Sequence, residues 1–575
     1  MAPFRIVFVH TEDRSFADTQ MFGIQFMPVW AYTLAAHLAA LPDLEMELLD
    51  LRIESIAAAR AADLFLFTGI NQDYEAIVAA RAALAAIFPE ARCVIGGPIC
   101  WSFKTAGRID ALGMFHHVVV GDGEEIVARL VTDLRDGRPL PWLLEVSTRF
   151  ALGRALPMHR PLLARTIHRY YGAVLEVSRG CPFLCEFCDI RVLPDNNRAH
   201  VKDPALVVAE LDTLHHLGVR QVLLACDNFV GDLRWAEEVC DRILAWQDVT
   251  GKALSLYTWL TINVARHSDL LAKLRRAGFD MFFIGVESFN RSSLLETAKV
   301  QNTALELAAA LRTIQSHGVI VVAGLIFGFD TDPDDIAEVM LRGILESGLI
   351  SGDPSLLTAL PGTPLYTRMA LAGRLRDVRF GLGGFKYRTN IRYLKPAARI
   401  RADFQTFVRR YNDGRYQYER LTRFYACLDS AHYRPPRTAG WADLRRLSAM
   451  TLGNARAVRL IALRVFRLLR APTRVWWLAR ALATTCARTS SQRPLWFYFK
   501  FWLFNWSNTV MKYAGLSDAD FDVESVLEAF TAAQVLPVAY EASGEEQIPA
   551  GKTRAQRRVT TAALREFVGD RLEPA

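Results

Sequence analysis

The chain has 575 residues, of which 51% are hydrophobic and 22% are charged. This composition is that of a globular protein and excludes a wholly disordered chain, and the length predicts about two to four domains. The nine cysteines are not arranged as a disulfide framework, so we expect thiols that stay reduced and free to bind metal. Residues 1–10 lead directly into a strand-like stretch without the pattern of a signal peptide, which predicts a cytoplasmic protein.

The formal net charge of +7 is unevenly distributed along the chain. Between Arg434 and Lys512 there are fifteen Lys and Arg residues against one acidic residue, Asp443. Because the rest of the chain carries a small excess of acidic residues, this segment predicts a separate basic body near the C-terminal end.

The first part of the chain alternates strand-like and helical patterns. Strands are predicted at 4–9, 45–49, 64–68, 93–95 and 117–120, and helices at 30–41 and 76–87. This alternation is typical of a doubly wound, Rossmann-like α/β domain with a parallel sheet, which we place at 1–137. Two glycine-rich turns, 96–98 and 121–125, follow strands and therefore lie where such sheets bind ligands.

A proline-containing stretch with little periodicity, 138–172, is predicted to be a linker to a second α/β unit. That unit has six strand-like segments, at 173–177, 221–224, 255–257, 281–284, 319–325 and 355–357. Six β/α repeats in about 190 residues predict a closed or partial barrel, which we place at 173–372. The remaining chain divides into a mixed α+β extension at 373–435, a basic, aromatic helical region at 436–545 and a loosely ordered tail at 546–575.

The most informative stretch follows the first strand of the second unit and reads EVSRGCPFLCEFCD over 176–189. Its thiols, Cys181, Cys185 and Cys188, are four and three residues apart, so a compact loop can bring them to one inorganic cluster. A zinc site is the alternative, but structural zinc sites ordinarily use two paired knuckles, and no second pair is present here. Three cysteines leave one iron of a [4Fe-4S] cluster open for an exogenous ligand, and we interpret the triad as that kind of metal site.

The spacing CxxxCxxC, with the aromatic Phe187 before the last cysteine, resembles the signature of the radical S-adenosylmethionine (SAM) superfamily. The resemblance implies that the open iron binds the amino and carboxylate groups of SAM. Matches to the other motifs follow in the family's order and imply SAM contacts at Phe187, Asp227, Asn228, Glu287, Ser288, Gly324 and Ile326. A glycine in a strand is more often explained by packing, so a single fragment is weak evidence for SAM binding. The order and the spacing of the fragments together are what indicate the family.

An α/β unit ahead of such a barrel resembles the cobalamin-binding domain of the cobalamin-dependent members. The resemblance implies cobalamin contacts in the two glycine-rich turns, at Gly96, Gly97, Gly121, Gly123 and Glu124. Glycine lets a large cofactor approach the backbone closely. No Asp-x-His-x-x-Gly motif supplies a histidine for cobalt, and a degenerate domain that packs without cofactor is the alternative. Cys93 and Cys100 are interpreted as buried apolar residues rather than as ligands of a second cluster.

Longer matches, among them SRGCPFLCEFCDI and LTALPGTPLY, resemble the hopanoid C-2 methylase-like subfamily. The resemblance implies a methyltransferase that acts on an unactivated carbon, with flavodoxin or ferredoxin as reductant, but it implies a class of enzyme rather than a substrate. The expectation of an apolar, lipid-class substrate comes from the basic, aromatic C-terminal region described below. The alternatives are an oxidoreductase or cyclase that modifies tetrapyrroles or lipids with the same cluster, and a non-enzymatic iron–sulfur sensor. At Trp259 the relatives tend to have glutamate, and the tryptophan either faces the substrate or packs in the core.

The basic region has a helical pattern with arginines on one side and apolar residues on the other, as for Arg456, Arg459, Arg467, Arg470 and Arg474 against Val458, Ile461, Val465 and Leu468. With the aromatic run 495–504 nearby, this pattern is typical of a helix on anionic lipid, and we expect peripheral contact with the inner membrane face through 440–515. No uncharged apolar run reaches the ~18 residues that cross a bilayer. A helical cap with an aromatic core is the alternative, and the apolar content argues against a nucleic-acid partner.

Overall fold

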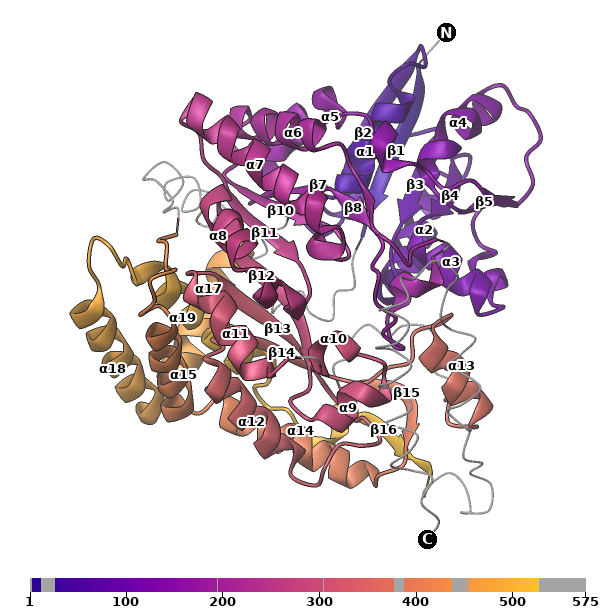
Figure 1. Cartoon of the computed structure of the whole chain (residues 1–575). Coiled ribbons are helices and arrows are strands. Elements are labelled where there is room, and N and C mark those ends of the chain that lie inside the picture. The colour runs from indigo at the N-terminus through magenta and orange to yellow at the C-terminus, as the bar shows by residue number, and fades with distance from the viewer. Residues whose placement is uncertain are drawn as a thin grey trace.

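The computed structural model describes residues 3–11, 26–193, 195–303, 305–376, 387–436, 452 and 455–526. These residues form two parallel sheets and a helical layer, which Figure 1 shows in chain order. The tail expected at 546–575 lies outside the described residues, as do 437–451, 453–454 and 527–545 of the expected basic region.

The first sheet has six parallel strands with helices on both faces. In spatial order the strands are β2 (Leu44–Asp50), β1 (Phe4–His10), β3 (Leu64–Thr68), β4 (Arg92–Gly96), β5 (His117–Val120) and β6 (Leu143–Glu145). The inner strands β1, β3, β4 and β5 are mostly apolar, which is typical of strands that are buried on both sides, whereas the edge strand β2 also carries Glu45 and Glu47. Helices α1 (Val29–Leu38) and α4 (Val127–Arg135) cover one face, and α2 (Tyr74–Ile87) and α3 (Pro98–Thr105) cover the other. The predicted doubly wound α/β domain is confirmed.

The stretch that we predicted as a linker, 138–172, contains regular structure. Strand β6 extends the first sheet beside β5, and α5 (Arg160–Thr166) buries two leucines against the strands and α1. The buried Tyr170 hydroxyl donates to Asp50 of β2 at 3.0 Å. A three-residue edge strand is too short to show an alternating pattern, so the sequence did not reveal it.

The second sheet also has six parallel strands and curves into a partial barrel. Its spatial order is β14 (Ser351–Leu356), β13 (Ile320–Phe327), β12 (Phe279–Glu287), β11 (Ser255–Trp259), β10 (Gln221–Ala225) and β7 (Ala173–Glu176). Strands β14 and β7 lie at the two ends of this order. Of the two predicted forms, a closed and a partial barrel, the structure therefore shows the partial barrel. The long outer helices are α6 (Pro204–His216), α7 (Leu233–Thr250), α8 (Ser268–Ala277), α11 (Leu307–Ser316) and α12 (Ile336–Ser347), and the short helices are α9 (Arg291–Glu296), α10 (Val300–Thr303) and α13 (Pro364–Leu371).

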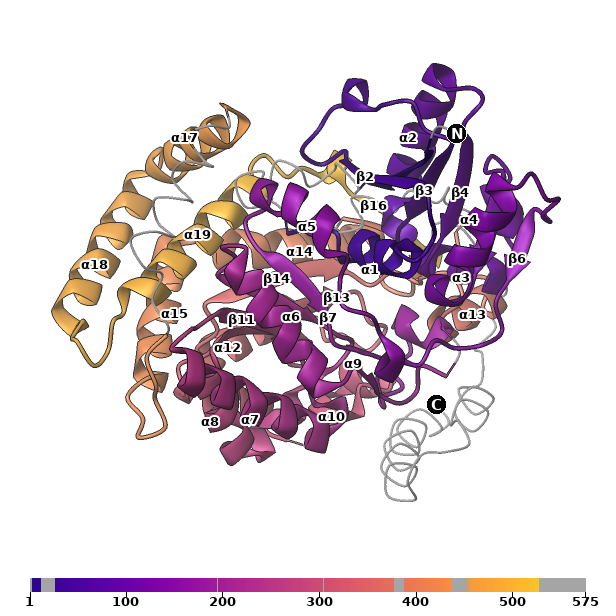
Figure 2. The ribbon, with the colours of Figure 1, turned by 90° about the horizontal axis from the view of Figure 1, so that it is seen from above.

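A C-terminal helical layer packs on the barrel on the side away from the first domain, as both Figure 1 and Figure 2 show. It consists of α14 (Ala397–Tyr411), α15 (Gly414–Cys427), α17 (Ala455–Leu469), α18 (Pro472–Arg488) and α19 (Trp496–Lys512), with β15 (Arg388–Tyr393) paired to β16 (Asp522–Ser525). In the described part of the chain, no helix is long and apolar enough to cross a bilayer.

The aromatic run that we placed at a membrane surface belongs largely to a core. Helix α19 buries Tyr498, Trp502 and Trp506 against the barrel strands and α15. The indole N–H groups of Trp502 and Trp506 donate to the carbonyls of Gln417 and Asn412 at 3.1 and 3.3 Å. A buried indole N–H needs an acceptor of this kind, and both tryptophans have one. The aromatic side of α19 therefore packs inward, as expected for the alternative in which this region is a helical cap with an aromatic core.

Candidate active site

The three cysteines lie in the loop that follows the first barrel strand, β7. A ladder between β8 (Ser178–Arg179) and β9 (His200–Val201) closes the base of this loop. Gly180 has φ +90°, and a Cβ there would collide with the carbonyl oxygen of Arg198, so the turn requires glycine. The amide of Cys181 donates to the carbonyl of Asn196 at 2.9 Å, which holds the first thiol in place.

Glu186, between the second and third cysteines, anchors the far side of the loop. Its amide donates to the carbonyl of Thr297 at 2.9 Å. Its buried carboxylate accepts two hydrogen bonds from the guanidinium of Arg368 in α13, at 2.7 and 2.8 Å. A planar, bidentate pair of this kind fixes both position and orientation. The loop is therefore held from elements that are far away in sequence.

Polar hydrogens point at the cysteine sulfurs. The buried amide of Gln301 donates to Sγ of Cys185 at 3.3 Å, and the amide of Asn228 lies 3.9 Å from Sγ of Cys181. Hydrogen bonds to sulfur are among the features that tune thiolate-bound clusters. Burial raises the pKa of the Cys181 thiol to about 12 and also raises the pKa of Cys188, so these thiols need a bound cation to ionise.

The arrangement fits a cluster of several irons. Among the described residues, no three His, Cys, Asp or Glu side chains meet as ligands of one metal ion would. In a [4Fe-4S] cluster each thiolate binds a different iron, so the sulfurs of Cys181, Cys185 and Cys188 need not meet at one point. A short loop with donors aimed at two of its sulfurs is suited to such a group.

The first pair of residues implied to contact SAM follows β10 and lies against the cysteine loop. The carboxylate of Asp227 accepts from the amide of Gly180 at 2.5 Å, and Asn228 is buried near Cys181. Burial raises the pKa of Asp227 to about 6, although the Gly180 N–H acts in the opposite direction. The end of β10 thus places a carboxyl and an amide beside the first cysteine.

Glu287, at the end of β12, has a strained backbone and a buried ion pair. Its φ of +63° is rarely adopted by a residue with a side chain, and such strain is concentrated at functional sites. Its carboxylate accepts from the ammonium group of Lys299 at 2.9 Å, and that ammonium lies 5.6 Å from the ring centre of Phe187. One lysine therefore connects Glu287 to the aromatic residue of the cysteine loop.

The other residues implied to contact SAM divide into two groups. Gly324 in β13 lies beside Glu287, since a Cβ there would be 3.6 Å from its carboxylate. Ile326 follows two residues later on the same face of the strand. Ser288 instead is fully buried, and its hydroxyl accepts from the amide of Asn290 and lies 3.7 Å from the sulfur of Met340 in α12. The structure does not bring the Ser288 side chain to the cysteines.

Trp259 lies on the inner face of the barrel. In β11 the alternate residues Leu256 and Thr258 are fully buried toward the helices, whereas Trp259 is half-buried on the opposite face. Its register partner in β12 is Phe283, which is 38% exposed in the middle of a strand. Of the two alternatives for this position, the geometry favours a ring that lines the interior rather than one that packs in the core.

A cavity of about 440 Å³ lies between the first sheet and the cysteine loop. All five residues implied to contact cobalamin line it, namely Gly96, Gly97, Gly121, Gly123 and Glu124. From the barrel side, Asp189, Ile190 and Asp227 line the same space. The cavity therefore extends from the carboxyl edge of the first sheet to the residue that follows the third cysteine.

Two of these glycines cannot be replaced without moving the backbone. Gly97 has φ +88°, and a Cβ would collide with the hydroxyl of Thr68, while Gly121 has φ +132° and a Cβ would lie 2.6 Å from Val146. The neighbouring Cys93 and Cys100 are buried in the core beneath α3, and burial raises the pKa of Cys93 to about 11. They have the environment of the inert apolar residues that we predicted.

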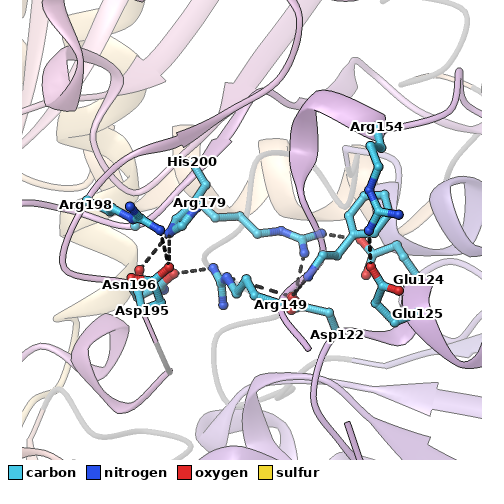
Figure 3. Close-up of polar contacts among 12 residues, drawn as sticks. Asp122, Glu124, Glu125, Arg149, Arg154, Arg179, Asp195, Asn196, Arg198 and His200 are labelled. Carbon is cyan, nitrogen blue, oxygen red and sulfur yellow. Dashed lines mark hydrogen bonds and ion pairs between the residues drawn. The ribbon is translucent and has the colours of Figure 1, made fainter. Parts of the chain in front are cut away.

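A network of charged side chains joins the first domain to the cysteine loop, as Figure 3 shows. Several of its members, among them Asp122, Glu124 and Arg179, also line the cavity. Arg179, two residues before Cys181, pairs with Asp122 at 3.4 Å, with Glu176 at 2.7 Å and with Glu124. Burial acts to raise the pKa of Glu176, but the guanidinium of Arg179 outweighs it and holds that pKa below the ordinary carboxyl value.

Arg149 completes the same network from the segment between the two sheets. Its guanidinium lies 3.8 Å from the carboxylate of Asp122 and donates to the side chain of Asn196. The amide of Phe150 also donates to Asp122, at 2.7 Å. The acidic turn after β5 is thus fixed against the base of the cysteine loop.

Comparison with known proteins agrees with the site that the geometry defines. Residues 175–342 match the family model of the Radical SAM superfamily. The chain carries a radical SAM domain. The matched segment begins in β7 and includes the cysteine loop, Asp227, Glu287 and Gly324.

Curated relatives include enzymes with different activities. The hopanoid C-2 methylase of Rhodopseudomonas palustris (strain TIE-1) is 31% identical over 285 residues, which is 48% of this chain and 52% of the relative. The anaerobic magnesium-protoporphyrin IX monomethyl ester cyclase of Synechocystis sp. (strain ATCC 27184 / PCC 6803 / Kazusa) is 26% identical over 267 residues, 43% of this chain and 51% of the relative. The match thus spans about half the length of these relatives.

Solved structures share the fold well beyond the radical SAM domain. The cobalamin-dependent S-adenosylmethionine radical enzyme OxsB with aqua-cobalamin bound has a TM-score of 0.56 and 14% identity, with 99% of this chain and 84% of that chain covered. The radical S-adenosylmethionine methyltransferase TsrM from Kitasatospora setae has a TM-score of 0.52 and 15% identity, with 66% of this chain and 76% of that chain covered. The predicted order of an α/β domain followed by a partial barrel is therefore confirmed.

Sequence reasoning missed several side chains around the radical SAM site. Lys299 directly precedes the short helix α10 and Gln301 lies within it, in a stretch without a recognised motif, and Arg149 lies in the predicted linker. Arg179 could have been suspected, because an arginine directly before Gly180 and Cys181 is next to the most informative motif in the chain. Apart from Glu176, which lies three residues before Arg179, the partners of these residues are 12 or more positions away in the sequence, so spacing alone could not identify them.

Proposed function

We propose that the protein is a cobalamin-dependent radical SAM methyltransferase that methylates an unactivated carbon of an apolar, lipid-class substrate. The single observation that carries the proposal is the cavity between the two sheets. Gly96 and Gly121 line it from the first domain, while Ile190 and Asp227 line it from the barrel. A cofactor held against the first sheet and SAM held at the cysteine loop would therefore face each other.

The residues of the chain have separate roles in this proposal. Cys181, Cys185 and Cys188 hold the cluster, and Asp227 and Asn228 receive the amino group of SAM. Glu287, positioned by Lys299, contacts the ribose, and Gly324 and Ile326 of β13 contact the adenine. The missing side chain of Gly285 leaves room for the Glu287 carboxylate and the Lys299 ammonium, which occupy the place of a Cβ. When bound, the cluster and SAM supply a carbon radical, and cobalamin supplies the methyl group.

The inner face of the barrel supports an apolar substrate. Trp259 and Phe283 lie side by side there and present two aromatic rings to the interior. Such rings exclude water and contact hydrocarbon, and neither ring acts as an acid or a base at the reacting carbon. Where the hopanoid-type relatives tend to have glutamate, Trp259 predicts a substrate that differs in shape or polarity at this point.

The proposal is tested with protein reconstituted with iron, sulfide and cobalamin, and assayed with SAM, reduced flavodoxin and a hopanoid lipid. S-adenosylhomocysteine formed together with 5′-deoxyadenosine supports methyl transfer. 5′-Deoxyadenosine alone, with a dehydrogenated or cyclised product, supports the oxidoreductase or cyclase alternative, which the likeness to the anaerobic cyclases makes the second candidate. SAM left intact under all conditions contradicts both enzymatic proposals.

Replacing Gly96 by phenylalanine is expected to weaken cobalamin binding about tenfold or more. Gly96 lines the cavity, and a Cβ at this position would lie 3.6 Å from the nearest side-chain atom, which is an ordinary contact distance. The backbone can therefore accept the substitution, and the phenyl ring would occupy the cavity. Cobalamin retained after desalting, measured by absorbance, checks the prediction. Gly153→Phe is the control, because nothing lies within 4 Å of its Cβ position; equal loss in both variants contradicts the assignment.

The expected partners and location extend the same proposal. A flavodoxin or ferredoxin is the reductant, and the protein acts in the cytoplasm at the inner face of the membrane, in contact with lipid through 440–515. No nucleic acid is expected. What supports the membrane contact in the described part of this range is the exposure of α17 and α18, rather than the buried aromatic residues of α19.

A further inference from the structure

Helices α17 and α18 carry an unusual concentration of exposed apolar side chains. On α17 these are Val458, Val465, Phe466 and Leu469, and on α18 they are Val475, Trp476 and Leu482. At about 100° per residue, the members of each set fall within about 120° of the helix circumference, and they therefore lie along one side of their helix. Phe466 and Trp476 are each 61% exposed, which is unusual for such large rings.

The burial of α17 is unusual at one position, because a charged residue lies between Leu460 and Leu468 on its buried side. Its buried side includes Arg464, whose guanidinium lies 5.0 Å from the ring centre of Phe504 and donates to Asn508 at 3.1 Å. Burial lowers the pKa of Arg464 to about 10. A helix that buries an arginine and exposes valine, phenylalanine and leucine is suited to an apolar environment on its outer side.

An open cavity of about 800 Å³ lies between α14, the end of α19 and the corner where α17 passes into α18, and four arginines line it. They are Arg409 of α14, Arg467 of α17, Arg470 at its end, and Arg474 of α18. Arg467 and Arg474 each donate once to a backbone carbonyl, at 3.3 Å, which leaves most of their N–H groups free for a ligand. Among the described residues, no Asp or Glu forms an ion pair with any of the four.

Four positive charges around one cavity repel each other unless an anion offsets them. The guanidinium fork matches the oxygens of a phosphate group, and the N-terminal end of the 17-residue helix α18 contributes partial positive charge from Ala471 onward. Leu469 and Val475, next to Arg470 and Arg474, are both exposed at the same corner. A phosphate that fits here would therefore have apolar surface beside it.

We propose that the outer side of α17 and α18 docks on an anionic phospholipid bilayer, with the phosphate of one lipid headgroup in the four-arginine cavity. Phe466 and Trp476 enter the boundary between headgroups and acyl chains, and the arginines pair with the headgroup phosphates. This inference deepens the membrane contact of the proposed function, on which it rests, but it does not depend on the methyl transfer. Charge complementarity identifies the bilayer as the partner of this surface. The exposed side of the two helices is apolar and is bordered by arginines that have no acidic partner among the described residues, so an anionic membrane matches both features.

The docking is tested by flotation of the full-length protein with vesicles of phosphatidylglycerol and phosphatidylcholine, and with vesicles of phosphatidylcholine alone. Wild-type protein is expected to float with the anionic vesicles only, and binding is expected to fall as salt screens the charges. Phe466→Glu combined with Trp476→Glu is expected to reduce the bound fraction at least tenfold. Val249→Glu, at an exposed apolar residue on α7, is expected to leave binding unchanged.

A second pair of variants tests the arginine cavity. Arg470→Gln with Arg474→Gln is expected to weaken vesicle binding roughly fivefold for each charge removed. Arg415→Gln, which removes an exposed arginine that pairs with Glu419 on α15, is the control and is expected to have little effect. Titration of the protein with inorganic phosphate distinguishes a headgroup site from a site for free phosphate.

Three outcomes would overturn the proposal. The first is absence of flotation at every content of phosphatidylglycerol. The second is tight binding of inorganic phosphate to the cavity together with vesicle binding that the arginine variants leave unchanged. The third is a dimer that Phe466→Glu with Trp476→Glu converts to a monomer, without flotation of the wild-type protein, because a second copy would then cover this surface.

Discussion

Replacing Cys185 by alanine is expected to abolish cleavage of SAM and to lower the iron and sulfide bound per chain. Cys185 is buried, accepts a hydrogen bond from Gln301, and lies in a loop whose ends are held by Asn196 and by Arg368. With two thiolates left, the loop cannot supply three ligands to a cluster. Iron and sulfide analysis after anaerobic reconstitution, and chromatography of 5′-deoxyadenosine, measure the two effects.

The matched control for this variant is Cys240→Ala, which removes an equally buried thiol in α7. We expect it to keep its iron and its SAM cleavage, with only the modest loss of stability that follows removal of a small buried group. Persistent SAM cleavage in Cys185→Ala would contradict the cluster assignment. Equal loss of iron in both variants would show that the effect is one of folding.

Replacing Arg179 by methionine is expected to lower the free energy of unfolding by about 3–5 kcal/mol. The substitution keeps much of the volume of the side chain but leaves three largely buried carboxylates, Asp122, Glu124 and Glu176, without their shared cation. Leaving buried carboxylates without a cation lowers the stability of the folded state by more than the ion pairs themselves raise it. Urea unfolding at neutral pH measures the change.

The same network predicts how the effect depends on pH. Arg179 holds the folded-state pKa of Glu176 below its ordinary value, so the stabilisation is present above the ordinary carboxyl pKa, about 4, and is lost as pH falls through the lowered value. The difference between wild type and Arg179→Met should therefore shrink as the solution is acidified. A difference that stays constant with pH would contradict the assignment to ionised carboxylates.

Arg198→Ala is the control for this prediction. Arg198 pairs with Asp195 at 2.7 Å near the same loop, but its side chain is 69% exposed. Solvent screens such a pair, so we expect a loss of less than about 1 kcal/mol. A loss as large as that of Arg179→Met would show that any change near the cysteine loop destabilises it, whatever the burial of the charge.

The sequence by itself determined the two parallel α/β units, the cysteine loop and the glycine turns. These features depend on local chemistry. Apolar runs that alternate with helical patterns predict parallel sheets, and thiol spacing limits which cluster a loop can hold. Gly97, Gly121 and Gly180 all have positive φ, which is the conformation for which glycine is used in turns. Motifs of this kind can be read without knowing what packs against them.

The tertiary structure decided how these parts act on one another. It placed Trp259 beside Phe283 on the inner face, brought Lys299 to Glu287, and connected Arg179 to the acidic turn of the first domain. It also buried Trp502 and Trp506 of α19 while it left Phe466 and Trp476 exposed, although all four lie in the same basic region. The direction of a side chain depends on which distant elements pack against its own, and a one-dimensional pattern does not contain that information.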